Sequence, residues 1–141
     1  SGCGGKSSDC PPGDRGCPCT ALQACNGDLV CDSNQCLEPH HHALQTNRVG
    51  LRACELVVVD GTERVAGVVF GEGTRGSHAR RGNRTAISVV SRSDADLPAS
   101  QVRVQTLASG DSTAGSLVVE RSACFDRTGT SVAGAAVTLG R

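Results

Sequence analysis

Residues 10–36 read CPPGDRGCPCTALQACNGDLVCDSNQC and contain six of the chain's nine cysteines. The cysteines follow the spacing C-x6-C-x-C-x5-C-x5-C-x4-C. Leucine and valine are scarce here, so apolar burial cannot offset the chain entropy that is lost on folding. The prolines, glycines, asparagines and aspartates between the cysteines favour turns. We therefore expect a compact unit made mostly of loops, which needs crosslinks to fold.

Disulfides explain this cysteine pattern better than a zinc cluster does. Structural zinc sites favour C-x2-C pairs, and none occurs in this sequence. The same absence argues against a redox-active C-x-x-C. Cys17 and Cys19 flank a single proline, so we expect them to bond to different partners. Six cysteines allow 15 connectivities, which the sequence does not choose between. The cysteines expected to form these disulfides are Cys10, Cys17, Cys19, Cys25, Cys31 and Cys36.

Cys54 and Cys124 are separated from this cluster, and we expect them to bridge each other. Closing a loop of roughly 70 residues is worth about 4 kcal/mol in the chain-entropy model. Eight paired cysteines in a chain of this size are typical of an oxidising compartment. The expected location is therefore extracellular, or the outer-membrane surface or periplasm of a bacterium.

The part of the chain from residue 51 onward has the pattern of an antiparallel β-sandwich. Residues 101–105 alternate polar and apolar side chains, which is typical of a half-buried strand. Phe70 and Phe125 are the two aromatic residues of the chain, so the core must be aliphatic. The tryptophan and tyrosine of immunoglobulin domains are missing, so the Ig-like description refers to architecture alone. The predicted strands are 52–59, 64–70, 84–91, 101–107, 116–121 and 131–139.

These observations predict an all-β chain, with a small disulfide-rich N-terminal module followed by an antiparallel Ig-like β-sandwich. Residues 1–9 are expected to form a flexible tether, and residues 10–36 the disulfide-rich module. Residues 37–50 carry no cysteine and little pattern, so they are predicted to be a linker. Residues 51–141 then form the sandwich.

The disulfide-rich stretch resembles a known kind of module. The sequence Gly16-Cys17-Pro18-Cys19, then Cys25, then Gly27-Asp28-Leu29-Val30-Cys31 and Cys36, is similar to a short cysteine-rich module of predicted secreted lipoproteins from myxobacteria and their relatives. That module has the form G-C-x-C, then C, then G-L-x-C-x4-C, and Asp28 interrupts its Gly-Leu pair. The resemblance covers residues 10–36 and implies an outer-surface location without indicating an activity.

Cys3 is the cysteine left over after the other eight are paired. Ser1-Gly2-Cys3 resembles the end of a bacterial lipobox, in which small residues precede the cysteine that becomes lipidated. A thioether link to diacylglycerol at Cys3 would attach the chain to a membrane. The alternatives are a tail cysteine that pairs within the disulfide-rich module or between two chains.

A basic segment at residues 75–84 is the candidate binding site. It is expected to form an exposed loop of the sandwich, and no acid occurs between Glu72 and Asp94. Guanidinium groups form bidentate hydrogen bonds with phosphates, sulfates and carboxylates. The expected partner is therefore an anionic ligand or a surface protein. The alternative is a solvated loop without a ligand. The candidate binding residues are Arg75, His78, Arg80, Arg81 and Arg84.

Other motifs carry little weight. The G-x-G-x-x-G at residues 71–76 is not followed by a helical pattern, which dinucleotide binding requires. Ser112 follows Gly110-Asp111, as in serine proteases, but no base or oxyanion hole accompanies it. Consecutive histidines at residues 40–42 face different ways in an extended chain and form at most a weak metal site. We predict no catalytic residues, cofactor or metal.

The net charge is zero and aromatic residues are scarce, so a nucleic-acid partner is not expected. The sequence therefore favours a non-enzymatic secreted or surface-anchored lipoprotein with a binding or structural β-sandwich. The alternative is a small disulfide-knot binding protein or protease inhibitor, because a loop held by disulfides loses little entropy when it binds.

Overall fold

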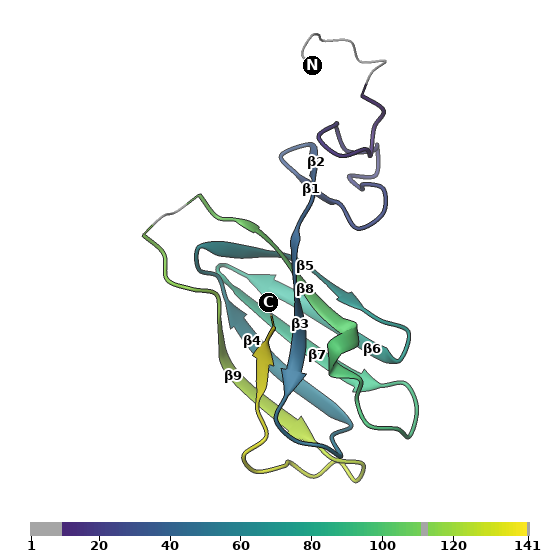
Figure 1. Cartoon of the computed structure of the whole chain (residues 1–141), viewed down its shortest axis with the longest axis vertical. Coiled ribbons are helices and arrows are strands. Elements are labelled where there is room, and N and C mark those ends of the chain that lie inside the picture. The colour runs from purple at the N-terminus through teal and green to yellow at the C-terminus, as the bar shows by residue number, and fades with distance from the viewer. Residues whose placement is uncertain (1–9, 111–112, 141) are drawn as a thin grey trace. The chain divides into compact units, whose positions relative to one another are not determined.

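The computed structural model describes residues 10–110 and 113–140, and their regular structure is almost entirely β. The chain divides into two compact units, Ser1–His40 and His41–Arg141. The first is rich in disulfides. The second is a β-sandwich, whose strands Figure 1 shows. The predicted fold class, a disulfide-rich module followed by an antiparallel sandwich, is confirmed.

The first unit consists of turns around one small hairpin, β1 (Val30–Asp32) and β2 (Gln35–Leu37). Ser33 and Asn34 connect the two strands, and both have positive φ angles, as a type I′ turn requires. Three disulfides hold the unit together, joining Cys10 to Cys17, Cys19 to Cys31 and Cys25 to Cys36. Cys17 and Cys19 therefore do bond to different partners.

The second unit contains two four-stranded sheets, ordered β10-β3-β8-β5 and β6-β7-β4-β9. A short 3-10 turn, Ala99–Gln101, leads into β8. The strands are β3 (His40–Thr46), β4 (Ala53–Val59), β5 (Glu63–Phe70), β6 (Thr74–Arg81), β7 (Arg84–Ser91), β8 (Val102–Ala108), β9 (Val118–Phe125) and β10 (Val137–Leu139).

Alternation along the strands fills an aliphatic core between the sheets. Val102 and Val104 of β8 are fully buried, as is Val58 of β4. Ile87 and Val89 of β7 face the same interior, while their chain neighbours face solvent. Because no large aromatic ring fills the centre, the register of the strands must be held precisely for these small side chains to meet.

Cys54 and Cys124 form the disulfide of the sandwich, as expected from the sequence. They lie directly opposite each other on the neighbouring strands β4 and β9, with their Cα atoms 4.1 Å apart. The bond therefore crosslinks two strands of one sheet. Both side chains are buried, so the bond also belongs to the core.

The linker predicted for residues 37–50 is wrong over most of its length, and the β unit begins at His41. Residues 40–46 form strand β3, which lies between β10 and β8. Leu44 is the buried aliphatic residue of this strand, so its sequence lacks the run of apolar side chains by which strands are recognised. The strand is specified by pairing with its neighbours rather than by its own pattern.

The predicted basic loop at residues 75–84 is also wrong, because residues 74–81 form strand β6. Gly82 and Asn83 make a two-residue turn into β7, and Gly82 takes the positive φ of 63° that a type II′ turn needs. Gly76 allows the ring of Phe70 from the other sheet to approach, since a Cβ there would lie 2.3 Å from that ring. Polar residues and glycine thus replace the usual strand formers.

The last predicted strands are displaced. The strand predicted at 116–121 runs from Val118 to Phe125. The strand predicted at 131–139 is reduced to Val137–Leu139, with an isolated bridge between Ser131 and Phe125. Gly134, with a φ of 77°, interrupts extended backbone between these two pieces.

Candidate functional site

The outer face of the β6-β7-β4-β9 sheet, which is the face turned away from the core, is the candidate site. β6, β7 and β4 pair in unbroken register, and the pairing of β4 with β9 contains one bulge between Val57 and Val58. Outward side chains therefore form four rows of four. Across β6, β7, β4 and β9 the rows are Arg81, Arg84, Val59 and Val118; Ala79, Ala86, Val57 and Arg121; Ser77, Ser88, Glu55 and Ala123; and Arg75, Val90, Ala53 and Phe125.

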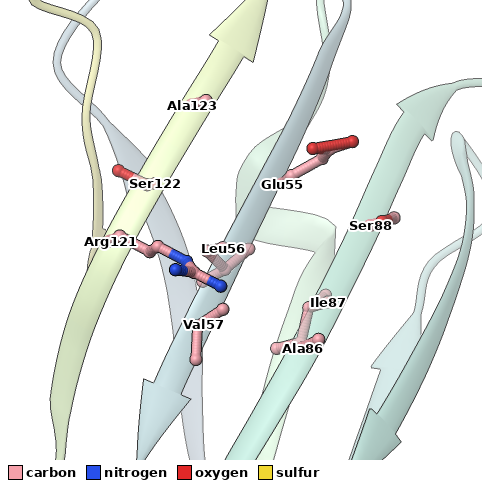
Figure 2. A pocket seen from close by; sticks show the side chains of 9 residues that line it. All are labelled: Glu55, Leu56, Val57, Ala86, Ile87, Ser88, Arg121, Ser122 and Ala123. Atoms are coloured by element: carbon pink, nitrogen blue, oxygen red, sulfur yellow. The ribbon is translucent and has the colours of Figure 1, made fainter.

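Small side chains in the middle rows leave this face hollowed. Figure 2 shows the hollow over β7, β4 and β9, whose volume is about 310 Å³. A second hollow of about 380 Å³ lies over β6, β7 and β4, and Glu55 and Ser88 line both. Arg121 borders the first hollow and Arg75 the second. The two hollows form one shallow surface with a guanidinium at each end.

Glu55 is the acid at the centre of this surface. Figure 2 shows its carboxylate directed toward Ser88 of β7, whereas the Arg121 guanidinium lies over Val57 of β4. Within the described residues the Glu55 carboxylate takes part in no hydrogen bond or ion pair, although Arg121 is on the next strand. An accepting carboxylate and a donating guanidinium are therefore both open to a ligand.

Arg80 does not belong to this face, because its position in β6 turns it inward. Its guanidinium donates to both carboxylate oxygens of Asp60 and, at 2.9 Å, to the backbone oxygen of Val65. The hydrogen bond with Asp60 raises the pKa of Arg80 above its ordinary value. Asp60 also accepts from the N–H of Val65 at 3.0 Å. Arg80 thus ties the edge of β6 to the start of β5.

Arg84 lies on the outer face but is paired there. Its Nε and a terminal nitrogen donate to the two carboxylate oxygens of Glu120, at 3.0 and 2.8 Å. These bonds raise the pKa of Arg84 and lower that of Glu120. Because the pKa of Glu120 is lowered in the folded chain, the pair contributes stability above the unfolded pKa of glutamate. That contribution is lost as the pH falls through the folded pKa.

The five predicted binding residues are therefore not brought together. Arg75 and Arg81 are exposed on the outer face, and neither guanidinium forms a hydrogen bond or ion pair with a described residue. His78 faces inward, and its ring centroid lies 6.4 Å from that of Phe70. Sequence reasoning missed Arg121 and Glu55, which join the site through β9 and β4. Only the strand register shows that they share the outer face with Arg75.

The histidines of β3 do not form a common site. His42 Nε2 lies 3.2 Å from a carboxylate oxygen of Glu63, and its Nδ1 lies 2.9 Å from the backbone oxygen of Gly140. Thr106 donates to the same oxygen of Glu63. His41 is on the opposite face of the strand, where its Nδ1 is buried without a partner in the structure. The three residues thus contribute to packing and polar contacts within one sheet.

Cys19, Cys25 and Cys36 bring their sulfur atoms within 4.8 Å of one another. All three are in disulfides, and a metal site requires thiolates. The glycine motif at residues 71–76 runs into strand β6, so no helix follows it. Cys3 and Ser112 lie outside the described residues.

Disulfides of this number indicate that the chain folds in an oxidising compartment outside the cytoplasm. In residues 10–110 and 113–140, no helix has the length and hydropathy to cross a membrane. Comparisons with protein-family models, curated proteins and solved structures find no match to this chain.

The inward-facing Arg80 and the outward-facing Arg75 should differ in their effect on stability. We predict that Arg80→Ala lowers the free energy of unfolding by about 1–2 kcal/mol, because Asp60 and the Val65 oxygen lose a charged donor. Arg75→Ala, which removes the same side chain from the outer face of the same strand, should change it by less than about 0.5 kcal/mol. Urea unfolding of both variants measures this difference. Equal losses would contradict the assignment.

Proposed function

We propose that this chain is a non-enzymatic, extracytoplasmic binding protein whose sandwich binds an anionic ligand across the outer face of the β6-β7-β4-β9 sheet. The observation that carries this proposal is the sorting of arginines. Arg80 and Arg84 are neutralised by carboxylates, whereas Arg75, Arg81 and Arg121 form no ion pair with a described residue. Guanidiniums held on rigid strands around a hollow surface suit carboxylates, sulfates or phosphates.

The surface is built for a broad ligand rather than a small enclosed one. Its hollows are open and meet at Glu55 and Ser88, and small side chains line each of them, Ala86 and Ala123 in one and Ala53 and Ser77 in the other. Of the four rows, Arg121 is at the β9 end of the second and Arg75 is at the β6 end of the fourth. Glu55 lies between them, in the third row. An extended anionic polymer or polypeptide would contact both guanidiniums, and a donor group in its middle would meet Glu55 and the serine hydroxyls.

Attachment to a membrane through a lipid at Cys3 is part of this proposal. It is supported by the small residues before Cys3 and by the similarity of residues 10–36 to modules of predicted secreted lipoproteins. The disulfides also support export of the chain to an oxidising compartment. The chain would then act at a bacterial outer surface or in the periplasm, with the cysteine-rich unit following the anchor in sequence.

Binding of model polyanions tests the proposed function. Dextran sulfate and poly-L-glutamate should bind to the whole chain at low ionic strength, and neutral dextran should not. The double variant Arg75→Ala/Arg121→Ala should bind about tenfold more weakly. Fluorescence anisotropy with labelled polymers provides the measurement.

The control is Arg103→Ala/Arg127→Ala, which removes equal charge from positions outside the outer face. It should bind almost as well as the parent chain. If both double variants lose the same affinity, binding follows net charge alone and the proposed site is wrong. Failure of either polymer to bind would also contradict the proposal.

A second function, binding by the cysteine-rich unit, is favoured by Leu22. This side chain is 88% exposed at the tip of a turn between Cys19 and Cys25. The backbone of Thr20 bonds to Ala24 at 2.9 Å, and the Thr20 hydroxyl accepts from two backbone N–H groups of the turn. The flanking cysteines are in separate disulfides, so the apolar tip is held rigidly and would lose little entropy on insertion into a partner's apolar pocket.

Protease inhibition tests this second function. A serine protease that prefers leucine, such as a chymotrypsin-like or subtilisin-like enzyme, should be inhibited by the whole chain and not by the Leu22→Asp variant. Because Leu22 is exposed, the substitution should leave the fold intact, which circular dichroism verifies. Inhibition unaffected by Leu22→Asp would assign the activity elsewhere, and absence of inhibition by the parent would rule out this protease class.

A further inference from the structure

Strand β6 is an open sheet edge, unlike the other three edges of the sandwich. It is eight residues long, it pairs with β7 alone among the described strands, and its register with β7 is unbroken. From Arg75 to Arg81 every residue is exposed. A regular strand of this length with one free side offers unpaired backbone groups to another chain.

The other edges are each closed in some way. β9 is followed by a segment that folds back on it, with Val132 N–H donating to Cys124 O at 2.9 Å. β5 has an irregularity between Val65 and Gly67, and the Arg80 guanidinium donates a hydrogen bond to the backbone oxygen of Val65. β10 is only three residues long. Such features prevent strand addition, and β6 lacks them.

The phase of the β6–β7 ladder identifies the free backbone groups. Arg92 N–H donates to Gly73 O at 3.0 Å, and the two-residue turn closes on the pair Arg81 and Arg84. Bonded and non-bonded pairs alternate in an antiparallel ladder, so Gly76, His78 and Arg80 direct their N–H and C=O groups away from β7. No described residue bonds to these backbone groups. They form a row of donors and acceptors along the edge.

The charge of β6 determines what this edge can accept. In the full antiparallel pairing of two copies, which centres on His78, Arg75 of one copy would lie opposite Arg81 of the other. Like charges directly opposite each other are destabilising, so a second copy of this chain is disfavoured. A strand with acidic side chains opposite Arg75 and Arg81 and small ones opposite Ser77 and Ala79 is complementary.

We infer that β6 binds an extended acidic segment of a partner polypeptide, which adds as a further strand to the β6-β7-β4-β9 sheet. Backbone hydrogen bonds to Gly76, His78 and Arg80 supply affinity. Specificity comes from two carboxylates of the partner, six residues apart, which pair with Arg75 and Arg81. This inference rests on the proposed function in one respect, that the unpaired arginines of the outer face meet an anionic ligand, and it adds that a polypeptide ligand joins the sheet at the β6 edge through Arg75 and Arg81.

The probe is the heptapeptide acetyl-Glu-Val-Thr-Val-Thr-Val-Glu-amide, whose glutamates face Arg75 and Arg81 when its valines pair with the free backbone groups. It should bind to the whole chain at low ionic strength, with affinity detectable at about 1 mM or below. The same peptide with N-methyl groups on its three valines keeps both charges but cannot donate to β6. It should lose binding, and so should the peptide with lysine in place of both glutamates.

Amide hydrogen exchange followed by NMR locates the peptide. Bound peptide should slow exchange at Gly76, His78 and Arg80 by about tenfold or more, and should leave other amides of the sheet nearly unchanged. Arg75→Ala/Arg81→Ala should weaken binding by about tenfold, whereas Arg103→Ala/Arg127→Ala should not.

The outcomes separate this inference from the proposed function. Equal binding of the parent and N-methylated peptides, or slowed exchange outside β6, would overturn edge addition while leaving anionic binding to the outer face intact. If polyanions and peptide both fail to bind, the two proposals fall together. If neither peptide binds but polyanions do, the edge inference alone is wrong.

Discussion

The register of the β6-β7-β4-β9 sheet is the constraint on which the rest of the sandwich depends. A slip by one residue in any of its strands would exchange the buried and exposed side chains. Cys54 and Cys124 are joined across β4 and β9, strands that are separated by most of the second unit in sequence. That bond fixes the pairing of the two strands and restricts the unfolded chain by a loop of 70 residues.

The same register determines which face of the sheet each arginine lies on. On β6, alternate residues face the core and the solvent, so Arg80 turns inward to Asp60 while Arg75 and Arg81 face outward. Glu55 of β4 and Arg121 of β9 face the same side of the sheet, at its centre and toward its other edge. The fully buried core between the sheets is mainly aliphatic, and Phe70 packs against it.

Much of the fold could be predicted from the sequence because its signals are local. Clustered cysteines indicated the disulfide-rich unit, and the alternation of Gln101 to Gln105 indicated strand β8. Strands β3 and β6 were not predicted, because histidines in β3 and arginines in β6 replace the apolar residues that mark strands. The candidate site on the outer face was not predicted either, for a related reason. A basic segment at residues 75–84 was visible, but only tertiary pairing separates its structural arginine, Arg80, from its exposed ones.

The central claim is that residues 74–81 form a strand whose one side is paired and whose other side is free. Hydrogen exchange of the unliganded chain, read amide by amide with NMR, tests it most directly. The predicted result is alternation, with slow exchange at Arg75, Ser77 and Ala79 and fast exchange at Gly76, His78 and Arg80. Uniformly fast exchange would show a loop, and uniformly slow exchange would show an edge already covered; either result would contradict the binding surface described for this sheet.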